Sequence, residues 1–171
     1  MHFPVSYNFL KKFNYVLLAL FIIFLTGMAK APPIVGGPAP GFELKSLDGK
    51  TISLSDMQGN LVVLHFWATW CVPCVKEMPE FQKAHESFKD KKIKILAINL
   101  AESKKNVEKF IQSYSLRLPI LLDKFGKVAA KYKVTGLPVT YFIAPDGIVR
   151  ERILGGGLTQ ALIDEKINQI K

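Results

Sequence analysis

A short apolar run followed at once by a helical pattern constrains the fold of this chain most. Residues Leu61–Trp67 are rich in β-branched and aromatic side chains, which suits a buried strand. From Cys74 to Asp90, apolar residues recur at spacings of three and four, as on one face of a helix. A second apolar run, Ile93–Leu100, completes a strand–helix–strand unit, whose strands should be parallel neighbours. We expect Pro79 to interrupt this helix and bend it after its first turn.

Two Asp-Gly pairs predict β-hairpins before and after this unit. One hairpin joins Phe42–Ser46 to Thr51–Leu54, and the other joins Val139–Ile143 to Ile148–Leu154. The remaining expected elements are a helix after Ser103, a short extended segment at Pro119–Leu122, a short helix at Phe125–Tyr132 and a last helix after Gly155-Gly156-Gly157. The pattern predicts an α/β fold with a central mixed sheet flanked by helices and an N-terminal β-hairpin extension.

The first thirty residues have the composition of an export signal. Lys11 and Lys12 precede an uncharged apolar stretch, and residues from about 13 to 29 approach the length of a membrane span. Paired lysines favour the cytoplasmic side, which places the rest of the chain outside the cytoplasm. We expect residues 1–30 to be a signal anchor, with a cleaved signal peptide as the alternative and a buried core helix as the least favoured interpretation. Residues 31–40 hold four prolines and two glycines and predict a spacer, which leaves 41–171 as one domain.

Composition and cysteine count narrow the classes of function. A hydrophobic fraction of 49% argues against a disordered chain. The net charge of +9 suits several kinds of acidic partner, but no arginine-rich stripe is present, so we expect no nucleic-acid partner. The two cysteines are too few for a disulfide-stapled scaffold, and the three histidines show no spacing that would complete a zinc site. We therefore expect redox chemistry, with no metal and no cofactor.

The two cysteines, Cys71 and Cys74, stand where the predicted strand ends and the helix begins. Backbone N–H groups and the helix dipole favour a thiolate at that place, so Cys71 should be the nucleophile. A thiol three residues later can resolve the resulting mixed disulfide, which assigns this role to Cys74. Two other interpretations are a Cu(I)-binding or delivery module and a thiol peroxidase. Both are disfavoured, because methionine or histidine do not cluster near the cysteines and the setting after Trp70 does not suit a peroxide-reactive cysteine.

At this point the chain resembles a known family. Residues Phe66–Cys74 match the signature of thioredoxin-fold proteins of the TlpA/ResA-like branch. Glu77 and Pro79 match a glutamate and a helix-bending proline of that branch, and Gly136–Thr140 match the loop with the fold's cis proline. The resemblance covers the chain from about Gly41 to Lys171 and implies a thioredoxin-like fold.

The resemblance also implies an activity and a location. Such proteins are exported thiol-disulfide oxidoreductases that face the periplasm or the outer cell surface, and they commonly act as reductases. ResA-like members reduce the disulfide of apocytochrome c and are re-reduced by a membrane-embedded thiol electron donor. We expect a reductase of that kind, anchored to the membrane through its N-terminal segment. The alternative is a general extracytoplasmic oxidase or reductase with other clients, because potentials in this fold run from about −270 to about −120 mV.

Five further residues are assigned roles from the resemblance. Glu77 is expected near Cys74, where it would tune thiol pKa values or transfer a proton, although residue type alone would equally allow a solvated acid. Trp70, Pro73, Leu137 and a cis Pro138 are expected to bind the substrate, with the extended backbone beside Pro138 available for pairing.

His65 is a departure from many cytoplasmic thioredoxins, which place a buried aspartate at this position. Two interpretations follow: a core residue with its hydrogen bonds made, which we favour, or a group that titrates and influences Cys74. Trp67, at the end of the same run, is expected to belong to the core.

Overall fold

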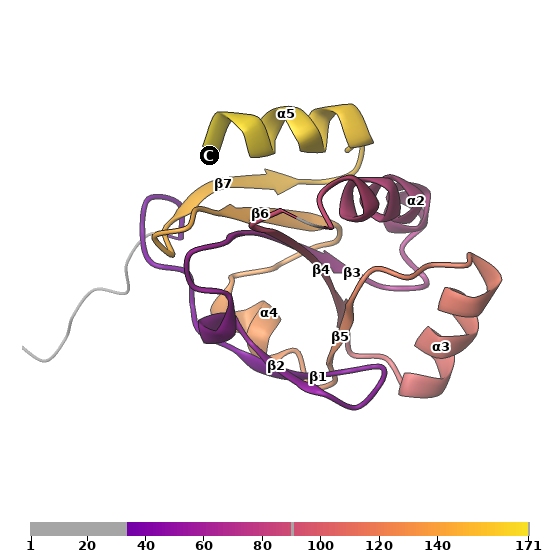
Figure 1. Cartoon of the computed structure of the whole chain (residues 1–171). Coiled ribbons are helices and arrows are strands. Elements are labelled where there is room, and N and C mark those ends of the chain that lie inside the picture. The colour runs from indigo at the N-terminus through magenta and orange to yellow at the C-terminus, as the bar shows by residue number, and fades with distance from the viewer. Residues whose placement is uncertain (1–33, 90, 171) are drawn as a thin grey trace, which may run out of the picture. The chain divides into compact units, whose positions relative to one another are not determined.

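The computed structural model describes residues 34–89 and 91–170 (Figure 1). The strands are β1 (Glu43–Ser46), β2 (Thr51–Ser53), β3 (Leu61–Trp67), β4 (Ile93–Leu100), β5 (Ile120–Asp123), β6 (Val139–Ile143) and β7 (Val149–Leu154). The helices are η1, a 3-10 turn (Leu54–Met57), α2 (Val72–Ser87), α3 (Lys104–Ser113), α4 (Lys127–Lys131) and α5 (Gln160–Ile170).

One mixed sheet organises these elements, in the order β2-β1-β5-β4-β3-β6-β7. Strands β3, β4 and β5 are parallel neighbours, as the strand–helix–strand pattern predicts. Strand β6 is antiparallel to both β3 and β7, and β1 is antiparallel to β2 and β5. The predicted thioredoxin-like α/β fold with its N-terminal hairpin is thereby confirmed.

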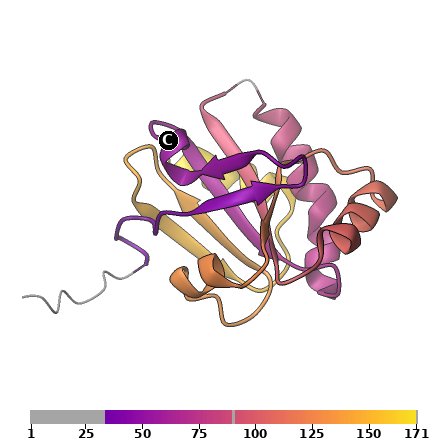
Figure 2. The ribbon, with the colours of Figure 1, turned by 90° about the horizontal axis from the view of Figure 1, so that it is seen from below.

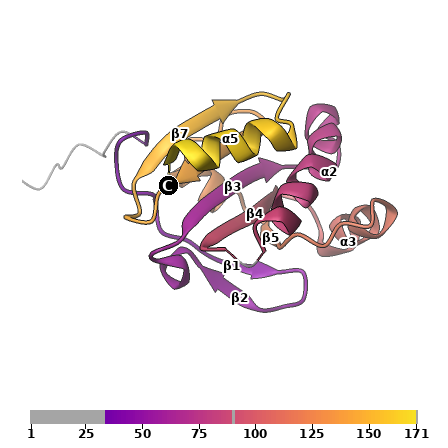
Figure 3. The same cartoon turned by 45° about the horizontal axis from the view of Figure 1, so that its top comes forward.

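Both faces of the sheet are covered by helices, which explains why β3 is buried along its whole length. Figure 1 shows α2 and α5 on one side and α4 on the other, and Figure 2 brings α4 and the β1–β2 hairpin to the front. Helices α2 and α5 pack side by side on the sheet (Figure 3). The core on the α2 side contains both cysteines, together with Trp67, Phe81 and Ile163 among others.

Helix α2 differs from its prediction in two ways. It begins at Val72 rather than at Cys74, and proline in the first turn explains this, because the N–H that Pro73 lacks has no partner within a helix there. It also continues through Pro79 as one element, so the predicted interruption is wrong. Met78 and Phe81 on either side are fully buried, and this packing outweighs the one hydrogen bond that Pro79 removes.

The packed domain starts before Gly41. Ile34 is buried in the core on the α4 side. The N–H of Gly36 donates to the carbonyl of Val149 at 2.8 Å, and the N–H of Ala39 donates to the carbonyl of Gly147 at 2.9 Å. The described part of the expected 31–40 spacer is therefore attached to the β6–β7 hairpin.

The expected signal anchor lies outside the described residues. Among residues 34–89 and 91–170, no helix is both long enough and apolar enough to cross a membrane.

Candidate functional site

Cys71 occupies the junction that the sequence predicts, between the end of β3 and the first turn of α2. It is the N-cap residue of α2, and its Sγ accepts a hydrogen bond from the N–H of Cys74 at 3.3 Å. An N-cap side chain that accepts from the first turn satisfies a helix N–H group that otherwise has no partner. The same N–H group and the helix dipole would stabilise a thiolate on Cys71 after reduction.

The two sulfurs form a disulfide, with the Cα atoms 5.2 Å apart. They differ in access to solvent: Cys71 is 5% exposed, and Cys74 is 0% exposed. Val72 and Pro73, which separate them, are both exposed. An incoming disulfide can therefore approach Cys71 but not Cys74.

Glu77 lies one helical turn after Cys74 and is buried, with only 3% of its surface exposed. Burial raises the pKa of this carboxyl, while hydrogen bonds from the backbone N–H groups of Leu158 and Gly157 act in the opposite direction. The bond from Leu158 to Oε1 measures 2.6 Å. Oε2 has no hydrogen-bond partner among the described residues. Glu77 is thus a buried acid beside the cysteine helix and not a solvated one.

The loop after β7 closes over the cysteine helix, which the sequence did not indicate. A Cβ atom at Gly156 would lie 2.9 Å from Cβ of Pro73 and 3.7 Å from Oε1 of Glu77. Only a residue without a side chain permits this approach of the two backbones. The triple glycine is the signal in the sequence for this close approach, whereas glycine content alone predicts only a boundary before the last helix.

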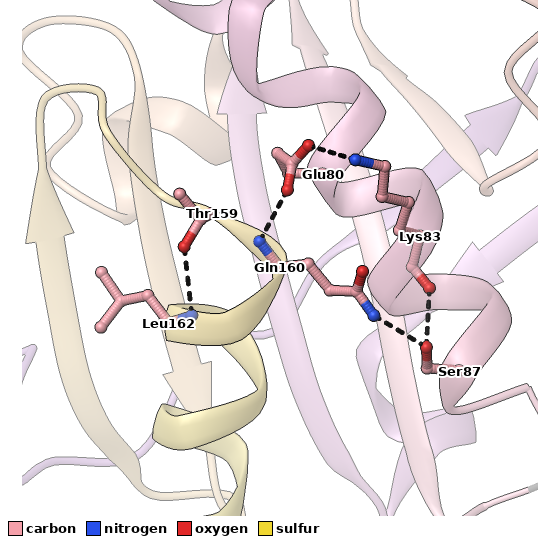
Figure 4. Close-up of polar contacts among 6 residues, drawn as sticks. All are labelled: Glu80, Lys83, Ser87, Thr159, Gln160 and Leu162. Carbon is pink, nitrogen blue, oxygen red and sulfur yellow. Dashed lines mark hydrogen bonds and ion pairs between the residues drawn. The ribbon is translucent and has the colours of Figure 1, made fainter.

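A second carboxylate of α2 holds the start of α5 (Figure 4). Glu80 accepts the N–H of Gln160 at 2.9 Å and pairs with Lys83 at 2.7 Å. The side chain of Gln160 donates to Oγ of Ser87 at 3.0 Å. Glu77 and Glu80 therefore bind the chain on both sides of Thr159, which fixes the Gly156 loop relative to α2.

The loop of Leu137 and Pro138 lies at the same end of the sheet as Cys71, because β6 begins where its antiparallel partner β3 ends. The Leu137–Pro138 peptide is cis, and the carbonyl of Pro138 accepts the N–H of Gly155 at 2.9 Å. Leu137 packs against the core cluster that contains both cysteines.

The two tryptophans lie in opposite environments. Trp67 is fully buried and contacts the ring of Phe110, with 5.0 Å between centroids. Trp70 is 68% exposed and Val72 is 65% exposed, which is unusual for side chains of this size and polarity. Trp70 and Val72 adjoin Cys71 along the chain, one on each side of it, so exposed apolar side chains flank the nucleophile in the sequence.

His65 is a buried core residue. Its Nδ1 lies 3.0 Å from Oγ1 of Thr140, and its ring stacks on Phe81 with 4.0 Å between centroids. Burial lowers the pKa of His65 to about 3, so the ring is neutral near pH 7. Its Nε2 has no partner in the described part of the chain.

Within the described ranges there is no group of three or more histidine, cysteine, aspartate or glutamate side chains that could hold a metal ion.

The comparisons with known proteins agree with the geometry of the site. The AhpC/TSA family model matches residues 35–152. The chain is 40% identical over 136 residues to the thiol-disulfide oxidoreductase ResA of Bacillus subtilis, covering 80% of this chain and 75% of that protein. Among solved structures, StoA from Bacillus subtilis superposes with a TM-score of 0.67 at 29% identity, covering 78% of this chain and 98% of StoA. The exposed lipoprotein thioredoxin Etrx1 from Streptococcus pneumoniae gives 0.69 at 27% identity, covering 76% and 99%. The chain therefore belongs to the AhpC/TSA family of thioredoxin-fold proteins and, within it, to the ResA-like thiol-disulfide oxidoreductases.

Proposed function

We propose that this protein is an extracytoplasmic disulfide reductase whose clients are apocytochrome c or similar thiol proteins. The observation that carries the proposal is the difference between the two cysteines: Cys71 caps α2 and keeps 5% of its surface exposed, whereas Cys74 is 0% exposed. One thiol is thus available to a protein client, and the other is reserved for the intramolecular step.

The reaction follows from this arrangement by two exchanges. The Cys71 thiolate attacks one sulfur of the client disulfide, which forms a mixed disulfide and releases the other client sulfur as a thiolate. The Cys74 thiolate then attacks Sγ of Cys71, which expels the second client sulfur and forms the Cys71–Cys74 disulfide seen in the structure. A membrane-embedded dithiol donor then reduces the Cys71–Cys74 disulfide to two thiols by the same kind of exchange, and its own two thiols become a disulfide.

The surrounding residues have supporting roles in this proposal. Glu77, whose pKa is raised by burial, accepts or supplies the proton that Cys74 exchanges as it becomes a thiolate. Trp70, Pro73, Leu137 and Pro138 form the surface on which the client lies. The exposure of Trp70 supports this role, because a client would cover an apolar surface that now faces water.

The location rests on the N-terminal segment and on the relatives. We propose that residues 1–30 export the chain and that residues from about 13 to 29 anchor it, so that the domain works at the outer face of the membrane. The name of the pneumococcal relative, an exposed lipoprotein, supports a site of action outside the cell membrane for this group.

A trapping experiment in the native organism tests the proposal. A Cys74→Ser variant should accumulate mixed disulfides through Cys71, and sequencing the trapped proteins should identify apocytochrome c or similar client proteins. A Cys71→Ser variant is the matched control and should trap nothing. Failure of the Cys74 variant to trap any client would refute the assigned roles, and a redox potential as high as that of strong oxidases would refute the reductase direction.

A further inference from the structure

The segment that carries Cys71 into the site is tied to a carboxylate from another part of the chain. Thr69 stands between β3 and Cys71, where the chain belongs to neither strand nor helix. Its N–H donates to Oε2 of Glu102 at 2.7 Å, and its hydroxyl donates to Oε1 at 2.5 Å. Both oxygens of one carboxylate thus hold one residue, two positions before the nucleophile. Bonds of this charge-assisted kind are shorter and stronger than neutral ones.

The structure also fixes Glu102 from its other side. Asn99, near the end of β4, is 1% exposed, and its Nδ2 donates to Oε2 of Glu102 at 2.7 Å. Because Asn99 of β4 pairs in register with Trp67 of β3, this bond holds the carboxylate near the end of β3. The carboxylate therefore connects the rigid ends of two parallel strands to the irregular segment that follows one of them.

The backbone before Glu102 adopts a conformation that alanine rarely takes. Ala101 has a φ of 57°, in the left-handed region, which is unfavourable for a residue with a Cβ. Its N–H is held by the carbonyl of Asp123 at 3.1 Å. This left-handed turn directly after β4 carries the chain to the position from which the Glu102 side chain reaches Thr69.

We infer that Glu102 is a positioning residue for Cys71, and that its carboxylate holds the Thr69–Cys71 segment so that the Cys71 sulfur stays at the N-terminus of α2. The sulfur depends on this placement, because its hydrogen bond from the Cys74 N–H at 3.3 Å requires Cys71 to stay at the N-cap of α2. The inference rests on thiol–disulfide exchange, which this chain shares with its relatives, and not on the identity of the client.

Two substitutions at this position separate geometry from charge. Glu102→Ala removes all three hydrogen bonds. Glu102→Gln removes the charge but can keep the contacts, because its carbonyl oxygen can take the place of Oε2 while its amide faces the Thr69 hydroxyl, which rotates to accept. Glu108→Ala is the matched control, since Glu108 lies on α3 and pairs only at 3.5 Å with the exposed Lys104.

The first measurement is the rate constant of the reduced full-length protein with oxidised glutathione. Glu102→Ala should react about tenfold more slowly, as expected for the loss of bonds to a charged group. Glu102→Gln and Glu108→Ala should stay within about twofold of the parent protein. A rate for Glu102→Ala equal to that of Glu108→Ala would overturn the inference.

The second measurement is the pH midpoint of Cys71 alkylation, made in a Cys74→Ser background so that only Cys71 reacts. A positioning role predicts a higher midpoint in Glu102→Ala, because the thiolate loses its placement at the helix terminus, and an unchanged midpoint in Glu102→Gln. A through-space effect of the carboxylate predicts the opposite sign, a lower midpoint in both variants, since a negative charge disfavours a thiolate. That result, or no change in either variant, overturns the inference.

Folding is checked by circular dichroism before either measurement. If Glu102→Ala does not fold, Thr69→Val replaces it, because this substitution removes only the hydroxyl bond from the other end. It should slow the exchange and raise the midpoint in the same directions, and a parent-like result overturns the inference. The glutathione assay needs no protein client, so a failure here is distinguishable from a failure of the proposed client or location.

Discussion

Gly156→Ala should be the most informative single substitution in the loop that covers the cysteine helix. The added Cβ would lie 2.9 Å from Cβ of Pro73, closer than such atoms approach one another, and Cα of Pro73 is 3.8 Å away. Pro73 is a ring fixed in the first turn of α2 and cannot turn aside. The loop or the helix must therefore move, and overpacking of this kind costs about 1–3 kcal/mol.

Two other glycines make this prediction specific. Gly155 has open space around a new Cβ but a φ of +82°, so Gly155→Ala should cost about 1 kcal/mol through backbone strain alone. Gly41 has open space and an ordinary φ, so Gly41→Ala should change stability by less than about 0.5 kcal/mol. The expected order of destabilisation is Gly156, then Gly155, then Gly41.

Urea unfolding of the oxidised and the reduced protein measures these differences. Because Pro73 separates the two cysteines, the cost of Gly156→Ala should differ between the two redox forms. Each 1.4 kcal/mol of difference would shift the reduction potential by about 30 mV. If Gly156→Ala unfolds at the same urea concentration as Gly41→Ala in both forms, the close packing of the loop on Pro73 is refuted.

Three further predictions concern buried and exposed side chains near the site. The pKa of His65 is about 3 in the fold and about 6.5 when unfolded, so the unfolded chain binds more protons between these values. The free energy of unfolding should therefore fall by on the order of 4 kcal/mol as the pH drops from 6.5 to 3. A His65→Gln variant should lose this pH dependence in urea unfolding. The pKa of Glu77 is raised, so its contribution to stability is full below about pH 4.5 and is lost as the pH rises through the raised value. Glu77→Gln should remove that decline in the same assay. An unchanged slope would contradict burial as the cause of the raised pKa. Trp67→Ala should lower the free energy of unfolding in urea by about 3–5 kcal/mol, whereas Trp70→Ala should lower it by less than about 0.5 kcal/mol. Trp70→Ala should still weaken the binding of a disulfide-containing client peptide, measured by fluorescence anisotropy.

Local patterns in the sequence were sufficient to predict the order of the helices and strands and the place of the two cysteines between a strand and a helix. The bounds of β3 and β4 agree with the predicted runs. Strand β3 is buried at every residue, as expected for a strand covered on both faces, whereas β4 is buried except at Lys94 and, in part, Leu100. Ser103 caps α3 as its residue type predicts, with its side chain accepting from Asn106. The start of α2 was misplaced, because helical spacing is not visible in a first turn that contains Cys71 as its cap and Pro73 inside it.

Contacts between distant segments could not be predicted in the same way. Glu102 and Thr69 are 33 positions apart, and Glu77 and Leu158 are 81 apart, so neither pair produces a local pattern. The ambiguity about Glu77 had the same origin, since its spacing from Cys74 is compatible with a solvated helical acid. Only the position of α5 against α2 decides that this carboxylate is buried and bonded to backbone N–H groups.

The direction of the strands explains why these distant segments meet at the cysteines. Strands β3, β4 and β7 all run the same way, because β4 is parallel to β3 and because β7 is antiparallel to β6, which is itself antiparallel to β3. Their final residues are Trp67, Leu100 and Leu154, which therefore lie at the same end of the sheet. The chain continues from each of them into a loop at that end. One loop carries Cys71, the next supplies Glu102 and the third supplies Gly156. The segment of the nucleophile is therefore contacted by the loop after β4, the direct neighbour of β3, and by the loop after β7, which β6 separates from β3 in the sheet. Changes in either neighbouring loop should then alter the reactivity of Cys71 without touching a client, which a disulfide-exchange assay with glutathione detects directly.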